Sequence, residues 1–286
     1  MATEAWTVRR LLEWTEDFLR KKGVEAPRLE AQILLAHALG CKKIDLYVRH
    51  EEEPPEDKRA TFRDMIKKRA EGMPVAYLVG YRDFYSLDFA VTPAVLIPRP
   101  ETETLVMEAL RVVKAIDAPR VLDVGTGSGC IAVTIARQHK TARVTATDLS
   151  ADALAVAGTN AQRHGVTDRV TFVQGDLFAP VSQGAFDLVV SNPPYIARAE
   201  FAALDAGVRD FEPRSALDGG IDGLDYYRRI ANEVPRALRP GGTVLVEIGL
   251  TQEPAVRDLF AAQLEPGPTF KDRAGRPRVV SARLPR

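Results

Sequence analysis

The N-terminal quarter of the chain has apolar residues at helical spacing. From Val8 to Leu19 they recur every three or four positions, with charged residues between them, which is the pattern of an amphipathic helix. Residues 26–40 and 55–72 repeat the pattern, and both stretches end in a glycine, a common helix terminator. The pattern predicts a small bundle of helices over residues 1–73.

The pattern changes over residues 74–97. Aromatic and β-branched residues alternate there with polar ones, around Gly80 and residues 86–88, as expected of strands joined by a turn. We predict a short β-hairpin that links two domains. A helix is expected to begin within residues 98–103.

From residue 118 onward, strand-like and helix-like segments alternate. The strand-like segments are RVLDVG, ARVTATD, RVTFVQGD, AFDLVVSN and GTVLVEIG, and the helical ones are GCIAVTIARQ, ADALAVAGTNAQRHG and GLDYYRRIANEVPRAL. This alternation predicts an α/β domain over residues 98–286, with a mostly parallel sheet covered by helices on both faces. Ligands of such sheets bind beyond the carboxyl ends of the strands, and candidate residues are sought there.

Composition and charge narrow the class of protein. The chain has 286 residues, 45% of them hydrophobic, which suits a globular protein of two domains. Lys and Arg number 39, as do Asp and Glu, so the net charge is zero. Residues 1–72 carry 15 basic against 14 acidic side chains, a net of +1. This balance argues against a protein that binds nucleic acids through their phosphate backbone, although a chain with zero net charge can still have a local basic face.

Cysteine content and hydropathy indicate the compartment. Cys41 and Cys130 are the two cysteines, too few for a disulfide framework or a four-cysteine zinc site, and we predict buried thiols in a reducing cytoplasm and no metal. No apolar run approaches the roughly 20 residues that span a bilayer. The N-terminus carries acidic residues and lacks the apolar segment of a secretory signal. We therefore predict a cytoplasmic protein with no membrane partner.

A glycine-rich loop follows the first strand-like segment. In LDVGTGSGC, residues 122–130, alternating glycines turn the chain into a helix whose free N–H groups can face a ligand. The next strand ends at Asp148, whose carboxylate can accept both hydroxyls of a ribose. The third is followed by Asp176, an acceptor for an exocyclic amine, and Leu177, an apolar surface for adenine. The candidate cofactor-binding residues are Gly125, Thr126, Gly127, Ser128, Gly129, Asp148, Asp176 and Leu177.

The loop indicates a nucleoside cofactor without selecting one. Gly127, Gly129 and Ala132 also satisfy the dinucleotide pattern G-x-G-x-x-A, so a nicotinamide enzyme is an alternative, as is a purely structural turn. Asp123 inside the strand and the open G-x-G-x-G turn favour S-adenosylmethionine. With these features the stretch resembles motif I of the class I methyltransferases.

The fourth strand-like segment ends in Asn192, Pro193, Pro194 and Tyr195. Each proline has a fixed φ angle and no N–H group, so the carbonyl groups here can face a cleft as acceptors. An –NH2 group could then donate one hydrogen to the Asn192 side chain and the other to the Pro193 carbonyl. Tyr195 would offer a flat face to a planar group. A proline-rich strand exit without chemistry is the alternative interpretation.

Such a niche suits methylation of an amide or aryl amine nitrogen. This nitrogen is a poor nucleophile because its lone pair is delocalised. Holding both N–H groups would orient the lone pair and stabilise the charge that develops on nitrogen. No histidine base is needed, and the four histidines lie outside these strand ends. The NPPY stretch is similar to the signature of amino-methyltransferases that act on adenine, guanine or glutamine nitrogens.

Two further stretches narrow the family. VLIPRPETE, residues 95–103, precedes the glycine loop, and FEPRSALDGGIDGLDYYRRI, residues 211–230, follows NPPY. With the helical bundle, they make the chain resemble, over essentially its whole length, the protein-(glutamine-N5) methyltransferases that modify peptide chain release factors. The resemblance implies a class I, Rossmann-like methyltransferase fold and S-adenosylmethionine as cofactor. It also implies methyl transfer to the glutamine of the release factor's Gly-Gly-Gln motif.

The same resemblance implies roles for individual residues. It assigns catalysis and substrate binding to residues 192–195, and cofactor binding to residues 125–129, Asp148 and Asn192. Leu177 stands where relatives can carry an aromatic residue against adenine, which leaves that stacking contact open.

The resemblance also concerns residues outside these motifs. Arg99, Glu101 and Thr102 would lie near the methionine end of the cofactor, although for Glu101 an acid in the first turn of a helix is an equal alternative. The helical bundle would be the module that docks the release factor.

Other functions have to be weighed against this one. A glutamine methyltransferase for a ribosomal protein would share NPPY and much of the sheet domain. A DNA or RNA amino-methyltransferase would have to flip a base out of a duplex and usually carries a basic surface, which the balanced charge disfavours. A nicotinamide oxidoreductase and a non-catalytic binding module are the remaining alternatives, and the intact NPPY argues against the second.

Overall fold

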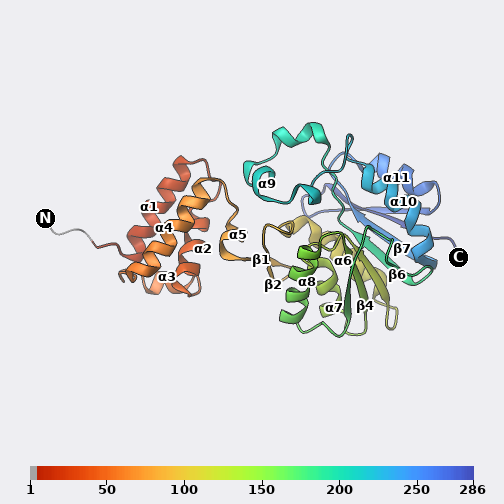
Figure 1. The fold of residues 1–286 in the computed structure, drawn as a ribbon, viewed down its shortest axis with the longest axis horizontal. Coiled ribbons are helices and arrows are strands. Elements are labelled where there is room, and N and C mark those ends of the chain that lie inside the picture. The colour runs from red at the N-terminus through yellow and green to blue at the C-terminus, as the bar shows by residue number, and fades with distance from the viewer. Residues whose placement is uncertain (1–4) are drawn as a thin grey trace. The chain divides into compact units, whose positions relative to one another are not determined.

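The structure is a computed structural model that describes residues 5–286, and the chain divides into two compact units. The first, called the helical unit, comprises the described residues up to Gly80 together with Ala206–Phe211. The second, called the sheet unit, comprises Tyr81–Asp205 and Glu212–Arg286. Figure 1 traces the chain from the helices of the first unit, in red and orange, into the sheet of the second. The domains expected from the sequence did not include the grouping of Ala206–Phe211 with the N-terminal helices.

Amphipathic segments form the helical unit. Thr7 caps the first helix by accepting a hydrogen bond from the Arg10 N–H at 3.3 Å. The second helix begins at Pro27, whose φ suits a first turn, and stops at Gly40 in the left-handed region. The helices are α1 (Val8–Lys21), α2 (Pro27–Leu39), α3 (Asp45–Val48), α4 (Glu56–Ala70), α5 (Val75–Val79) and α9 (Ala206–Phe211). The predicted N-terminal bundle is thereby confirmed.

The hairpin is shorter than the range 74–97 expected for it. Helix α5 occupies the first part of that range, because Pro74 precedes a helix without losing a needed N–H and Gly80, at φ 78°, ends it. The hairpin strands are β1 (Tyr81–Phe84) and β2 (Leu87–Ala90). They belong to the sheet unit, where Phe89 is fully buried in the core.

A seven-stranded sheet forms the centre of the sheet unit (Figure 1). Its order is β5-β4-β3-β6-β7-β9-β8; the first five strands are parallel, and β9 runs antiparallel to both of its neighbours. The strands are β3 (Arg120–Val124), β4 (Arg143–Asp148), β5 (Val170–Gln174), β6 (Phe186–Ser191), β7 (Leu238–Glu247), β8 (Glu265–Lys271) and β9 (Pro277–Arg283). The predicted α/β fold with a mostly parallel sheet is confirmed.

The last two strands were not among the predicted ones. The β8 segment contains Pro266 and Pro268, which argue against a central strand. It pairs only with β9, at the edge of the sheet, where the missing proline N–H groups leave no ladder bond unmade.

Alternate side chains of the strands enter two different cores. In β6, Leu188 and Val190 belong to the core packed against α6, α7 and α8, whereas Val189 belongs to the core packed against α10 and α11. All three are fully buried, and such burial contributes about 1.5–3 kcal/mol for each side chain. The helices are α6 (Glu103–Val113), α7 (Cys130–Gln138), α8 (Ala151–Arg163), α10 (Asp225–Ala237) and α11 (Glu253–Ala261), with short 3-10 turns η1 (Pro100–Thr102), η2 (Arg198–Ala203) and η3 (Arg214–Ala216).

The chain changes direction across the sheet between β3 and β6. From β3 it continues outward to β4 and β5, and it returns to β6 on the other side of β3. Val124 of β3 and Ser191 of β6 are partners in the register, and the Ser191 Oγ donates to the Val124 carbonyl at 2.7 Å. The glycine loop and Asn192 therefore leave the sheet side by side, at the kind of switch point where open α/β sheets bind ligands.

Candidate active site

A cavity of about 360 Å³ lies at this switch point. The structure brings most of the predicted site residues to its wall. Those lining it are Gly125, Thr126, Gly127, Ser128, Asp148, Asp176, Leu177, Asn192, Pro193 and Pro194. Gly129 and Tyr195 are not among the lining residues, and each has another place in the structure.

The glycine loop is held in shape by two carboxylates. Asp123, fully buried, accepts the Thr126 hydroxyl at 2.6 Å and the Ala132 N–H at 3.2 Å. Asp148 accepts the Gly127 N–H at 2.8 Å from within the loop. Because Gly125, Gly127 and Gly129 all have positive φ, only glycine adopts this course without strain. These hydrogen bonds and backbone angles together fix the course of the loop.

Gly129 serves packing instead of lining the cavity. A Cβ on this residue would stand 3.0 Å from the Cβ of Ala157, so the glycine lets α7 and α8 approach closely. One turn further along α8, the buried Asn160 side chain donates to the Ser128 carbonyl at 2.8 Å and exchanges two hydrogen bonds with the Ala90 backbone. These hydrogen bonds tie the β1–β2 hairpin to the glycine loop, and no sequence pattern marks Asn160 for this role.

The residues after β5 form the other side of the cavity. Leu177 lines the cavity with an apolar side chain that is 8% exposed, and its backbone has φ 48°. Asp176 pairs with Arg229 of α10 at 2.7 Å. No sequence pattern marks Arg229 as its partner, because 53 positions separate the two residues.

The Asn192 side chain is held from behind. Its Nδ2 donates to the Thr102 Oγ1 at 3.3 Å, and its Oδ1 accepts no hydrogen bond from any residue within 5–286. Thr102 and Arg99 both line the cavity, and their expected place near the methionine end of the cofactor stays a prediction. Glu101 does not line it, and its carboxylate lies 3.5 Å from Arg276.

Tyr195 is placed differently from the expected flat face in the cleft. Its ring packs against the core of α10 and α11, and burial raises the pKa of its hydroxyl to about 12. Its backbone instead meets the loop that follows. A Cβ on Gly219 would stand 2.8 Å from the Tyr195 Cα, and one on Gly223 would stand 2.5 Å from the Tyr195 carbonyl oxygen. Only glycine permits this contact, which explains the DGGIDG stretch.

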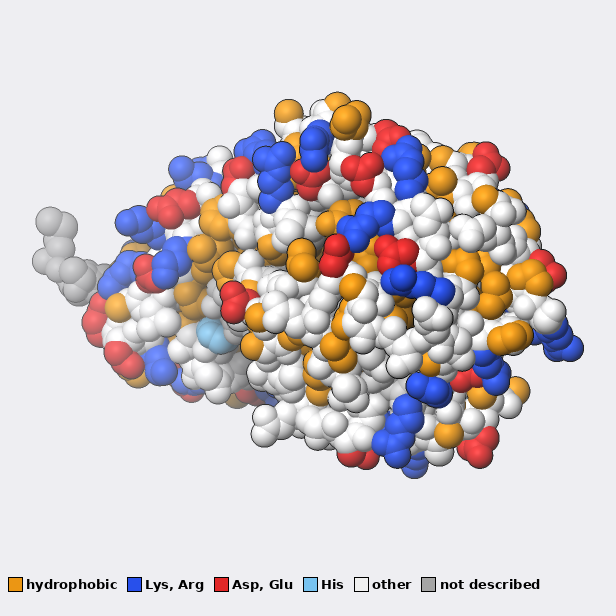
Figure 2. All heavy atoms as spheres, turned by 45° about the vertical axis from the view of Figure 1, so that its right-hand side comes forward, with side chains coloured by type: hydrophobic (Ala, Val, Ile, Leu, Met, Phe, Trp, Pro, Cys, Tyr) orange, Lys and Arg blue, Asp and Glu red, His pale blue; other side chains and the backbone are white. Residues whose placement is uncertain are grey.

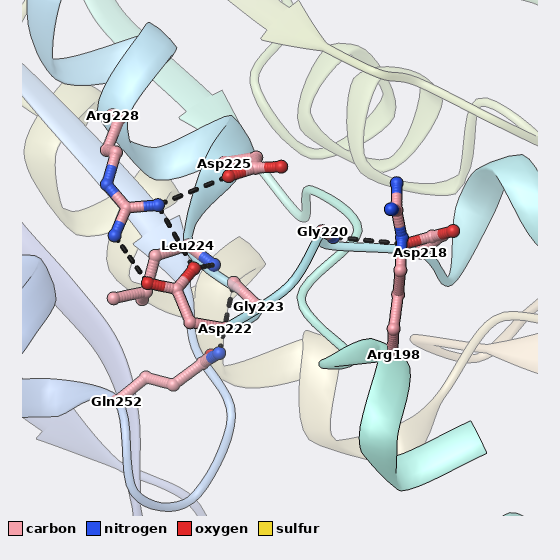
Figure 3. Close-up of polar contacts among 9 residues, drawn as sticks. All are labelled: Arg198, Asp218, Gly220, Asp222, Gly223, Leu224, Asp225, Arg228 and Gln252. Carbon is pink, nitrogen blue, oxygen red and sulfur yellow. Dashed lines mark hydrogen bonds and ion pairs between the residues drawn. The ribbon is translucent and has the colours of Figure 1, made fainter. Parts of the chain in front are cut away.

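Gln252 connects that loop to the NPPY stretch. Its Nε2 donates to the Tyr195 carbonyl at 2.9 Å and to the Gly223 carbonyl at 3.1 Å. Figure 3 shows Gln252 reaching Gly223, and Arg228 forked between Asp222 and Asp225. Nothing in the sequence marked Gln252, because a lone glutamine after a strand carries no pattern.

A buried carboxylate joins two walls of the cavity. Glu212 is 5% exposed; it accepts the Ile97 N–H at 3.0 Å and pairs with the Arg99 guanidinium. Pro98 and Pro213, the neighbours of these residues, line the cavity from the two segments. Glu212 thus explains why the IPRP and FEPR stretches lie together.

Replacing Glu212 with alanine is expected to destabilise the protein by about 2 kcal/mol, since the buried Ile97 N–H loses its acceptor. Urea denaturation measures the free energy of unfolding, and calorimetry should show weaker cofactor binding in the folded variant. Glu265→Ala, at an exposed position of β8, is the matched control and should change stability by less than about 0.5 kcal/mol. Equally small effects of both substitutions on the free energy of unfolding would contradict the role of Glu212 in joining the two walls of the cavity.

Two carboxylic acids lie deep beneath the site. Burial raises the pKa of Asp123 to about 7, against the hydrogen bond from Thr126. Burial also raises the pKa of Glu247 to about 7, against a hydrogen bond from Thr102 and the positive charge of Arg278. At high pH both acids are ionised while buried, and this lowers the free energy of unfolding.

We expect the protein to be more stable at pH 6 than at pH 8. The folded pKa of each acid exceeds its unfolded value near 4, so the stabilisation from their protonation is lost as the pH rises through 7. Lowering the pH from 8 to 6 should add about 1 kcal/mol per group to the free energy of unfolding, measured by urea denaturation. Glu247→Gln should remove the part of this pH dependence that comes from Glu247. An unfolding free energy that does not change between pH 6 and pH 8 would contradict the expectation.

The remaining reactive groups are unremarkable for chemistry. Cys41 and Cys130 are free, and burial raises the pKa of the Cys130 thiol to about 12, which keeps it protonated. Within residues 5–286 no cluster of His, Cys, Asp and Glu is arranged to hold a metal ion. Across the same residues, every helix is too short or too polar to cross a bilayer.

Two family models match separate parts of the chain. The model described as PrmC N-terminal domain matches residues 10–80, and the one described as Methyltransferase small domain matches residues 102–207. The first corresponds to the N-terminal helices. The second contains the glycine loop, Asp148 and the NPPY stretch.

Curated relatives match over nearly the whole length. A release factor glutamine methyltransferase from Rhodopirellula baltica is 46% identical, over 96% of both chains. One from Geobacter sulfurreducens is 48% identical, over 90% of this chain and 89% of its own. Among solved structures, a methyltransferase from Pyrococcus furiosus has a TM-score of 0.51 and 17% identity, over 81% of this chain and 100% of its own, and supports the fold alone. On the identity and coverage of the curated relatives, the chain belongs to the release factor glutamine methyltransferase family.

Proposed function

We propose that the protein transfers a methyl group from S-adenosylmethionine to the side-chain amide nitrogen, N5, of the glutamine in the Gly-Gly-Gln motif of peptide chain release factors. One observation carries the proposal: the Asn192 amide stands beside the glycine loop, donates to Thr102, and leaves its Oδ1 for a donor from outside. Family membership supports the same activity. A translation factor as substrate implies action in the cytoplasm.

The cavity fits S-adenosylmethionine. Its volume of about 360 Å³ lies in the range of cofactor sites. Asp148 accepts one N–H at each carboxylate oxygen, from Gly127 and Ser150, and a carboxylate oxygen can accept two; both hydroxyls of a ribose can therefore bind it. Leu177 supplies an apolar wall for adenine, beside Asp176. Bound here, S-adenosylmethionine supplies an electrophilic methyl group on a sulfonium.

The residues of the chain orient the acceptor. Asn192 Oδ1 and the Pro193 carbonyl accept the two hydrogens of the substrate carboxamide, which turns the nitrogen lone pair toward the methyl donor. Their acceptor dipoles stabilise the positive charge that develops on nitrogen in the transition state. The two prolines hold this geometry with fixed φ angles, and Tyr195 supports it through its backbone bond to Gln252.

The face drawn in Figure 2 suits a protein substrate better than a nucleic acid. The face drawn in Figure 2 carries Lys and Arg side chains interspersed with Asp and Glu, without a continuous basic stripe among its described residues. Phosphate-backbone binding depends on such a stripe. This observation favours a release factor over the DNA or RNA alternative.

The test is methylation of an unmodified release factor. The factor is purified from cells that lack the modifying activity and mixed with the protein and S-adenosylmethionine, and its tryptic peptides are weighed by mass spectrometry. We expect a single added methyl group on the Gly-Gly-Gln glutamine. An unmodified peptide beside methylated ribosomal protein, DNA or RNA would overturn the assignment and identify the rival.

For the helical unit we propose that it docks the release factor. A second cavity of about 440 Å³ lies there, lined by aromatic and aliphatic side chains that include Trp14, Phe18 and Phe62. Trp14 is 49% exposed and stacks on Phe18. Trp14→Ala should raise KM for the intact factor at least about fivefold and leave kcat unchanged; an unchanged KM would remove this groove as the docking surface.

A further inference from the structure

An aromatic side chain lines the cavity at the switch point and has no role in the site described so far. Among residues 5–286, Tyr226 of α10 is the one aromatic residue in the wall of this cavity, and it is half-buried. The next residue, Tyr227, is placed differently: it is fully buried, and its hydroxyl donates to the Glu247 carbonyl at 2.8 Å. Burial in the core thus accounts for Tyr227 and leaves Tyr226 to be explained.

Two contacts place Tyr226 at the Asp176 end of the cavity. The Arg229 guanidinium pairs with the Asp176 carboxylate at 2.7 Å and lies over the Tyr226 ring, 5.9 Å from its centroid, which is a cation–π contact. The Gly175 N–H donates to the Asp148 carbonyl at 3.0 Å, which joins this end to the residue proposed to bind the ribose. The ring therefore lies close to where the nucleoside is expected.

The leucines at this end offer no aromatic face. Leu177 lines the cavity but is only 8% exposed, because it packs into the core of α10 and α11, so it presents little surface to a ligand. Leu149, which follows Asp148, also lines the cavity and is aliphatic. Tyr226 packs against the same core as Leu177. Its ring can stack on another planar group, which contributes interaction energy beyond the area that is buried.

We propose that adenine of S-adenosylmethionine stacks on the Tyr226 ring, and that Arg229 positions this ring and the Asp176 carboxylate together. Arg229 bonds to Asp176 Oδ2, and no residue of the described chain donates to Asp176 Oδ1. That oxygen is left for the exocyclic amine of a base that lies against the ring. The inference rests on the proposed function only in taking S-adenosylmethionine as the methyl donor, and it does not depend on which substrate is methylated.

Binding of S-adenosylhomocysteine, measured by isothermal titration calorimetry, tests the contact without turnover. Tyr226→Ala should weaken binding at least about tenfold, the effect of removing one base–aromatic stack. Tyr226→Phe keeps the ring and should bind nearly as tightly as the wild type. Tyr226→Leu keeps apolar bulk without the ring and should bind as weakly as Tyr226→Ala. Wild-type affinity in Tyr226→Leu would refute stacking.

The matched control is Tyr81→Ala on β1. Tyr81 is 38% exposed and is not among the described residues that line the cavity. This variant should keep the wild-type dissociation constant within about twofold, as expected of a surface substitution. An equal loss of affinity in Tyr81→Ala and Tyr226→Ala would show that the effect is not local to the cavity and would overturn the proposal.

A second ligand locates the lost contact. 5′-Methylthioadenosine has the adenine and ribose of the cofactor and lacks its amino acid part. Tyr226→Ala should weaken binding of this ligand by a factor similar to that for S-adenosylhomocysteine, because the missing contact is to the base. A loss confined to S-adenosylhomocysteine would place Tyr226 at the methionine end and overturn the proposal.

Tyr226→Trp serves if the smaller side chains disturb α10. The emission of the added indole should fall when 5′-methylthioadenosine binds, because a stacked base quenches indole fluorescence. The wild type is the blank, since its Trp6 and Trp14 belong to the helical unit. Unchanged emission at saturation would refute the contact. If the wild type methylated no release factor but these binding results held, the proposed function would fall and the adenine contact would stand.

Discussion

Replacing Asn192 with alanine is expected to lower kcat for methylation of the release factor at least about 1000-fold. Removal of one preorganised polar group from a transition-state site costs about 100- to 1000-fold, and here the acceptor for one N–H of the substrate is lost together with the orientation of the nitrogen. The affinity for S-adenosylmethionine should stay within about fivefold, because the contacts with Thr102 and the substrate are lost while the glycine loop and Asp148 are intact. Single-turnover rates and calorimetry measure the two effects separately.

Asn232→Ala is the control, since Asn232 is exposed on α10 and far in sequence from the NPPY stretch. It should retain wild-type kcat. Turnover of Asn192→Ala near the wild-type rate would mean that the carboxamide is held by other groups, and the proposed mechanism would be wrong. A large loss of cofactor affinity would instead make Asn192 chiefly a cofactor ligand.

Replacing Asp148 with alanine is expected to weaken binding of S-adenosylmethionine about 100-fold. The carboxylate accepts the Gly127 N–H at 2.8 Å and the Ser150 N–H at 2.9 Å, so its loss both loosens the glycine loop and removes the acceptor proposed for the ribose hydroxyls. Hydrogen bonds to a charged group contribute about 1.5–3 kcal/mol each, and about 2.8 kcal/mol corresponds to a 100-fold change in affinity. Isothermal titration calorimetry gives the dissociation constant.

Asp152→Ala removes the same charge from an exposed position in the first turn of α8. It should alter the affinity by less than about threefold, since an exposed charge is largely screened. If the two variants bound S-adenosylmethionine equally well, Asp148 would not be a cofactor ligand. At saturating cofactor, kcat of Asp148→Ala should recover to within about tenfold of the wild type, which separates binding from catalysis.

Motifs that sit directly after strands were predictable from the sequence. The glycine loop, Asp148 and NPPY each follow an apolar run, and in a parallel sheet the carboxyl ends of neighbouring strands meet at one edge. Val124 of β3 and Ser191 of β6 are partners in the sheet, so the glycine loop and NPPY begin at the same height along the sheet edge. Their meeting around one cavity therefore follows from the sequence pattern and the fold class it predicts.

Residues that act through long-range contacts were not predictable. Glu212 meets the Ile97 N–H across 115 positions, and Asn192 meets Thr102 across 90. Glutamate and threonine are common types, and single side chains of this kind form no pattern. The direction of the Tyr195 ring was not predictable either, because it depends on how residues 218–225 pack against its backbone.

By itself, the sequence determined the fold class, the family and the local motifs of the site, because hydrophobic periodicity and turn residues act within a few positions along the chain. Only the tertiary structure decided which side chains support those motifs from behind. It turned Tyr195 toward the core and placed Thr102 behind the Asn192 amide. These choices depend on close packing and on the pairing of buried polar groups, which are satisfied only when distant segments of the chain come together.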